Sequence, residues 1–167
     1  KVVNIIDIEQ WFYHNKGEYA PPGGVNMAQR QYMRKIRTGS ARFEDVYRAV
    51  SEYRQQYPDK AVIYSAQKAP ELCWAALMAG GSCAAIPVTD KAFLAELSQM
   101  TPRPSLVAGF YMLSGDNGYL FYRESEGSFN IDLGEGNYTL YSIDARSGVL
   151  TRLRDTSSTV TLESKGI

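Results

Sequence analysis

The sequence predicts an α/β layer followed by an antiparallel all-β region. Short apolar runs rich in β-branched residues, at 2–8, 61–65 and 83–88, alternate with stretches whose apolar residues follow helical spacing. After the Pro-rich segment 101–104, apolar residues recur at every second position instead. This change of period predicts two domains, comprising residues 1–104 and 105–167.

Composition limits the classes of function. A hydrophobic share of 44% and a charged share of 22% are typical of a soluble globular protein. Eighteen basic residues balance eighteen acidic ones, whereas a nucleic-acid binder normally carries a basic excess. No apolar run reaches the roughly 20 residues that span a bilayer. Neither a nucleic acid nor a membrane is therefore expected as a partner.

The first apolar run, 2–8, opens the chain directly. Runs of this kind are typical of strands buried on both faces, which need neighbours on both sides. We therefore expect this chain to be the C-terminal part of a longer protein. The polar stretch 9–39 that follows is longer than an ordinary connection, which indicates a functional or elaborately packed loop.

Three helices are predicted in the first region. Ser40 is expected to cap the first, and Glu44 and Asp45 favour its N-terminal dipole. Pro70 suits the first turn of the second helix, which Gly80 ends. The third helix follows Thr89 or Asp90. The apolar stripe of the first helix contains Phe43, Val46, Tyr47, Val50, Tyr53 and Tyr57.

Turn-forming residues divide the second region into short strands. They occur at 115–118, 126–127, 134–137 and 146–148, and the segments between them alternate apolar and polar residues. This pattern predicts a small antiparallel β-sandwich.

Aromatic and cysteine residues leave alternatives open. The twelve Tyr, six Phe and two Trp either pack the core or form a surface that stacks on sugar rings. Cys73 and Cys83 lack metal-ligand spacing, and we expect both to be buried free thiols. No metal-ligand cluster and no cofactor motif are found, so neither is predicted.

Two parts of the chain resemble a known family. The stretches G-Y-L-F-Y (118–122), G-S-F-N-I-D-L (127–133) and Y-T-L-Y-S-I-D-A-R-S-G (138–148) resemble the small C-terminal β-sandwich often labelled a putative collagen-binding domain. In that family it follows a (β/α)8 barrel of the glycoside-hydrolase type. The run W-A-A-L-M-A-G-G-S (74–82) looks like the last helix-to-strand passage of such a barrel.

The resemblance implies a fold and a partner. The runs 2–8, 61–65 and 83–88 would be the sixth, seventh and eighth barrel strands, so the chain would hold the last three βα units. An N-terminal fragment of the same protein would complete the barrel. The resemblance further implies a carbohydrate ligand and a secreted or periplasmic location. Collagen binding is not carried over, because no residues here have collagen-recognition chemistry.

Candidate site residues follow the first strand, because active sites of such barrels lie at the carboxyl ends of strands. Asp7 and Glu9 are the candidate catalytic pair, since glycoside hydrolysis uses two carboxylates. Alternatively they neutralise an Arg or bind a sugar hydroxyl. The candidate substrate-binding residues in the following loop are Trp11, Tyr13 and His14. Alternatively, the Trp11 ring closes the top of the barrel and the His14 imidazole forms a hydrogen bond with the backbone.

The segment after the second strand departs from the family pattern. Related hydrolases commonly place a glutamate there, whereas this chain has Ser65 and Gln67 and no carboxylate before Glu71. Ser65 has no nucleophile-elbow glycines around it. Gln67 is a candidate substrate-binding residue, and Arg30 and Gln31 are expected to anchor the long loop. Two alternatives follow. Either the catalytic pair of carboxylates comes from other strands, including the missing ones, or the barrel binds sugar without cleaving it.

These observations predict the C-terminal portion of a glycoside hydrolase that acts on a carbohydrate. The alternative is a non-catalytic carbohydrate-binding or scaffold protein with a degenerate barrel. A third possibility is a free-standing two-domain interaction protein with a small open α/β layer.

Overall fold

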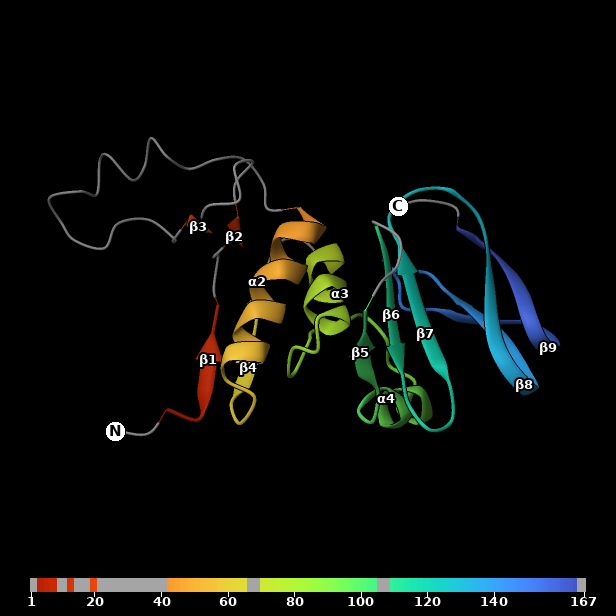
Figure 1. The fold of residues 1–167 in the computed structure, drawn as a ribbon, viewed down its shortest axis with the longest axis horizontal. Helices are drawn as coiled ribbons and strands as arrows, with labels where there is room; N and C mark the ends of the chain where they lie inside the picture. Colours follow the sequence, from red (N-terminus) through yellow and green to blue (C-terminus); the bar gives the residue numbers. More distant parts are fainter. Residues whose placement is uncertain are drawn as a thin grey trace, which may run out of the picture. The chain divides into compact units, whose positions relative to one another are not determined.

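The computed structural model describes residues 3–8, 12–13, 19–20, 42–65, 70–104 and 109–164. Their contacts divide the chain into two compact units, Lys1–Ile86 and Pro87–Ile167 (Figure 1). Whereas the sequence places the boundary between residues 104 and 105, these contacts place it between Ile86 and Pro87. The segment 87–104 therefore belongs to the second unit.

A parallel strand pair organises the first unit. Strand β1 (Ile5–Asp7) pairs with β4 (Ala61–Ile63), with Ile5 opposite Ala61 and Asp7 opposite Ile63. Two further bonds extend the ladder, because Ala61 N donates to Asn4 O at 3.0 Å and Ile8 N donates to Ile63 O at 2.9 Å. A short antiparallel pair, β2 (Phe12–Tyr13) and β3 (Tyr19–Ala20), also belongs to this unit.

Helix α2 (Phe43–Gln56) packs its predicted apolar face against β4 and the next helix. Phe43, Val46 and Val50 are buried, so the first half of the stripe forms core. The helix begins after Arg42, which is its N-cap residue, and Asp45 at the third position accepts a hydrogen bond from Arg42 N. The predicted cap, Ser40, lies outside the described residues.

Helix α3 (Pro70–Met78) is buried over most of its surface: residues 72–76 and Met78 are buried and Leu77 is half-buried, as expected of an apolar helix. It ends where Gly80 adopts a φ of 78°, and Gly81 N donates to Ala76 O at 2.8 Å. A Cβ at Gly81 would lie 2.7 Å from Ala76 O, so only glycine fits this close return of the chain.

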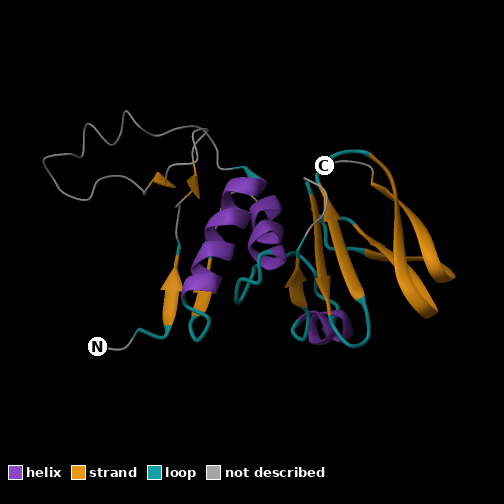
Figure 2. Ribbon diagram, viewed as in Figure 1, coloured by secondary structure: helices purple, strands orange, loops and turns teal. Residues whose placement is uncertain are grey.

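The predicted barrel fold is wrong. The described residues are mostly strand, with short helices and small sheets, and do not form three βα units of a barrel (Figure 2). Residues 83–88, the predicted eighth strand, are irregular. Cys83 has a φ of 55°, outside the strand region, and Pro87 has no N–H to donate to a ladder. Between residues 82–88 and the second edge of β4, the main-chain bond is from Ser82 N to Val62 O at 2.6 Å.

The second unit begins with a short helix and a three-stranded antiparallel sheet. Asp90 caps helix α4 (Lys91–Leu97) by accepting from Phe93 N at 2.8 Å. Strands β5 (Thr101–Arg103), β6 (Phe110–Ser114) and β7 (Tyr119–Arg123) then pair in that order. The β6–β7 turn occupies residues 115–118, where turn residues predicted it.

A long ribbon of β8 (Gly127–Ile143) and β9 (Leu150–Ser164) completes the second unit. The predicted turn at 134–137 lies inside β8 as a bulge, where the register shifts between Asp132 and Asn137. Gly134, with a φ of 79°, supplies the unusual backbone conformation, and Tyr138 Oη donates to Leu133 O at 2.7 Å.

Aromatic rings join the two antiparallel sheets. Phe110 on β6 stacks on Phe121 with ring centroids 5.8 Å apart and meets Phe129 of β8 edge-on at 4.7 Å. Tyr119 contacts both Phe121 and Tyr138. These rings therefore pack the unit, as the core interpretation of the aromatic content predicts, although Tyr119 and Tyr141 are exposed.

The turn between β8 and β9 is fixed by Asp144 and Gly148. Backbone N–H and hydroxyl of Ser147, with the N–H of Arg146, donate to Asp144 Oδ1 and hold the pKa of this carboxyl below its usual value. Gly148 has a φ of 72° and is buried against the backbone of Pro87 and Val88.

Replacing Gly148 with Ala should destabilise the protein by more than about 2 kcal/mol. The new Cβ would meet backbone atoms, including Val88 N at 2.7 Å, in addition to the left-handed φ. Gly134→Ala is the matched control, because Gly134 has a similar φ but no atom within 4 Å of its Cβ position. Urea denaturation should show the larger loss for Gly148→Ala, and equal losses would contradict the packing of this turn.

Candidate functional site

The carboxyl ends of β1 and β4 lie side by side and bring two polar residues together. Asp7 is the last residue of β1, and Ser65 follows β4 by two residues. The Ser65 hydroxyl donates to the Asp7 carboxylate, at 3.1 Å from Oδ1 and 3.0 Å from Oδ2. The two residues are 58 positions apart in the chain, so the parallel register alone creates this pair.

The pair offers hydrogen-bond acceptors to the solvent. Asp7 is exposed and Ser65 is partly exposed. The Ser65 hydroxyl donates its only proton to Asp7. The remaining lone pairs of both side chains can therefore accept hydrogen bonds from a ligand. The Asp7–Ser65 pair therefore suits a ligand that presents hydroxyl, ammonium or amide N–H donors, and it disfavours anions.

A second polar cluster lies on the helix-facing side of β4. Asp45 on α2 is 7% exposed, and the Arg42 guanidinium donates to both of its oxygens, at 3.1 and 3.2 Å. This pairing satisfies Asp45, whose role is to hold the start of α2. Burial raises the pKa of Tyr64 to about 12, with smaller contributions from the negative charges of Cys73 and Asp45. Tyr64 is thus a neutral phenol at physiological pH.

The structure describes two of the predicted site residues, Asp7 and the backbone of Tyr13. The candidate catalytic residue Asp7 is described, and it contacts Ser65 rather than a second carboxylate among the described residues. Tyr13 belongs to β2, although only its backbone is described. The remaining predicted residues lie outside the described residues: Glu9, Trp11, His14, Arg30, Gln31 and Gln67. Their roles stay predictions.

The sequence interpretation did not predict that Ser65 is the hydrogen-bond partner of Asp7. The available signal is positional, because both residues lie at the ends of short apolar runs that predict neighbouring parallel strands. Carboxyl ends of parallel strands share one edge of a sheet, where polar side chains gather.

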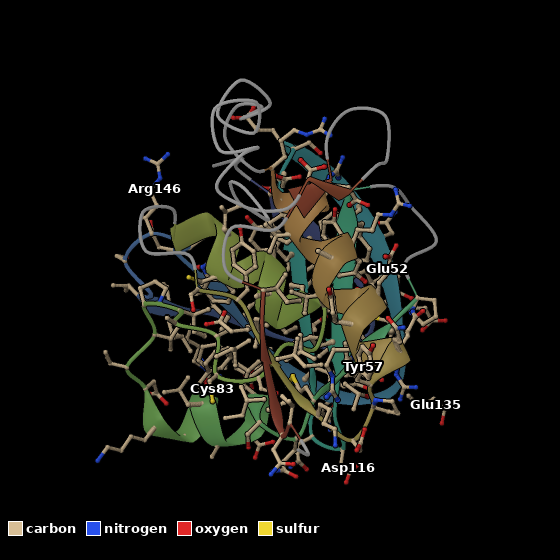
Figure 3. All side chains as sticks on the ribbon, turned by 90° about the vertical axis from the view of Figure 1, so that its left-hand side faces the viewer. Glu52, Tyr57, Cys83, Asp116, Glu135 and Arg146 are labelled. Atoms are coloured by element: carbon tan, nitrogen blue, oxygen red, sulfur yellow. The ribbon has the colours of Figure 1, made fainter. Side chains whose placement is uncertain are left out.

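The cysteines and acidic residues do not form a metal site in the described ranges. No group of three or more His, Cys, Asp or Glu side chains gathers there. Both cysteines are free thiols, as predicted, but only Cys73 is buried; Cys83 is exposed (Figure 3). The expected burial of Cys83 is wrong because its segment is irregular instead of a strand.

Comparison with known proteins places the chain in a family. A family model described as Domain of unknown function (DUF6298) matches residues 1–100, and the chain therefore belongs to this family. The matched range includes both strands that carry the Asp7–Ser65 pair. Comparisons with curated proteins and with solved structures find no match. Within the described ranges, every helix is too short or too polar to span a membrane.

The elevated pKa of Tyr64 predicts a loss of stability at alkaline pH. The Tyr64 phenol loses its proton near pH 10 in the unfolded state and near pH 12 in the folded state. The stability that the neutral phenol contributes to the folded state is therefore complete below pH 10 and is lost as the pH rises to 12. We expect a loss of roughly 1 kcal/mol, allowing for solvent screening of this partly exposed ring.

Urea denaturation between pH 8 and pH 12 tests this expectation. The Tyr64→Phe variant should show a smaller decline over this range than the wild type, whereas Tyr141→Phe, at an exposed ring, should match the wild type. An unchanged decline in Tyr64→Phe would contradict the proposed burial of this phenol.

Proposed function

We propose that this protein binds carbohydrate without cleaving it, through the Asp7–Ser65 pair at the carboxyl ends of β1 and β4. The supporting observation is the hydrogen bond that presents the two side chains as one acceptor group. Sugars expose vicinal hydroxyl donors, and a carboxylate is a strong acceptor for them. Residues 118–148 resemble a domain that accompanies glycoside hydrolases, and this association favours the same ligand class.

Binding is favoured over hydrolysis by the surroundings of Asp7. Both mechanisms of glycoside hydrolysis need a second carboxyl group across the scissile bond. Among the described residues, the partner of Asp7 is the hydroxyl of Ser65. Hydrolysis by Asp7 with Glu9, and a secreted or periplasmic location, stay predictions from the sequence.

Isothermal titration calorimetry with neutral oligosaccharides such as cellohexaose and xylohexaose tests the proposal. Asp7→Asn should weaken binding about tenfold and Ser65→Ala about threefold, because a hydrogen bond to a charged group is worth more than one to a neutral group. Thr139→Ala is the matched control. Its hydroxyl donates to Asp155 at 2.8 Å in an equally exposed pair of the second unit.

Two results would overturn this function. Binding that is unchanged in both Asp7→Asn and Ser65→Ala would place the site elsewhere. Release of reducing sugar by the wild type, abolished in Glu9→Gln, would establish hydrolysis instead of simple binding.

A further inference from the structure

None of the described elements packs on one face of the parallel strand pair. Side chains of Ile8 and Val62 point to the side on which α2 packs, and both are buried. On the other face, Val3 and Ile5 are each 59% exposed, and Ile63 is partly exposed. Parallel sheets are normally covered on both faces, so this exposed apolar face is unusual.

The outer edge of β1 is also open among the described residues. Asn4 O and Ile8 N bond to β4, so the even-numbered residues of this strand face β4. In a parallel ladder alternate residues face opposite edges, which directs the N–H and C=O groups of Ile5 and Asp7 away from β4. The described sheet has only β1 and β4, and Figure 3 looks onto β1 from the open side.

The uncovered face carries a charge at one end. Val3, Ile5 and Asp7 follow each other at alternate positions, so the face is apolar at two positions and anionic at the third. Asp7 takes part in none of the ion pairs between described residues, and its partner Ser65 is neutral. A complementary surface has two apolar groups and one cation at the same spacing.

We propose that β1 binds an extended segment of a partner polypeptide, which adds a strand at the open edge. Main-chain bonds to Ile5 and Asp7 supply the pairing, and alternate side chains supply the specificity. Two of these side chains are apolar and cover Val3 and Ile5; the third is Lys or Arg and pairs with Asp7.

The charge of Asp7 limits the registers in which a second copy of the chain could bind instead. An antiparallel copy of β1 centred on Ile5 would place Val3 opposite Asp7 and leave its charge unpaired, whereas a copy centred on Asn4 would place Lys1 opposite Asp7. A second copy is therefore the rival occupant that the experiment must separate from a partner polypeptide. The open main-chain groups favour a polypeptide over a lipid or another apolar ligand, which would leave them without partners.

Fluorescence anisotropy with two labelled, blocked heptapeptides tests the proposal. Thr-Lys-Thr-Val-Thr-Val-Thr matches antiparallel pairing with β1, and Thr-Val-Thr-Val-Thr-Lys-Thr matches parallel pairing. At least one should bind the full chain, with Kd raised about tenfold by Ile5→Lys and about fivefold by Asp7→Asn. Replacing the peptide Lys with Glu should weaken binding by a similar factor. N-methylation should do the same at the fourth residue of the first peptide or the fifth residue of the second, because these are the N–H groups that face the carbonyl oxygen of Ile5 in the two pairings.

Leu153→Lys is the matched control, because Leu153 is 57% exposed in the second unit and the substitution adds the same charge. It should leave peptide binding unchanged. The inference is overturned if neither peptide binds the wild type, if Ile5→Lys and Leu153→Lys behave alike, or if the N-methylated peptide binds as well as its parent. Light scattering that shows a dimer, lost in Ile5→Lys, would identify a second copy as the occupant and overturn it too.

This inference stands apart from the proposed sugar site, although both use Asp7. Ser65→Ala should weaken sugar binding and leave peptide binding unchanged, whereas Ile5→Lys should do the reverse. Either proposal can therefore fail without the other.

Discussion

The parallel pairing of β1 with β4 is the constraint on which the first unit depends. It joins two distant segments of the chain through main-chain bonds at both ends, from Ala61 N to Asn4 O and from Ile8 N to Ile63 O. One face of the pair gives α2 an apolar surface on which to pack. The register of the same pair sets Asp7 beside Ser65, so the core and the candidate site have a common origin.

The predictable parts of the fold are those whose residues repeat a regular pattern. The stripe that includes Phe43 and Val46 predicts helix α2, and the period-two segments after residue 110 form antiparallel strands. Local sequence patterns predict the wrong secondary structure where the backbone conformation of a few residues determines it. Residues 83–88 are apolar enough for a strand, but Cys83 has a positive φ. The turn residues at 134–137 form a bulge because β8 continues its pairing with β9 beyond them.

The site was predictable only in part, for a related reason. The position of Asp7 at the end of an apolar run marks it as a candidate, and the structure does place it at the carboxyl end of a strand. Its hydrogen bond to Ser65 depends on the register between two distant strands, which hydrophobic pattern alone does not determine. Tyr64 follows the same rule, because its burial and its charged neighbours, Cys73 on α3 and Asp45 on α2, come from other segments of the chain.

Hydrogen exchange of individual amides, followed by NMR on the intact chain, tests the strand pairing most directly. The account predicts slow exchange at Ile8 and Ala61, whose amides bond within the ladder, and fast exchange at Ile5 and Asp7 on the open edge. Equal protection of all four amides would mean that another strand of the chain covers this edge. Fast exchange at Ile8 and Ala61 would contradict the parallel pairing itself, and with it the Asp7–Ser65 site.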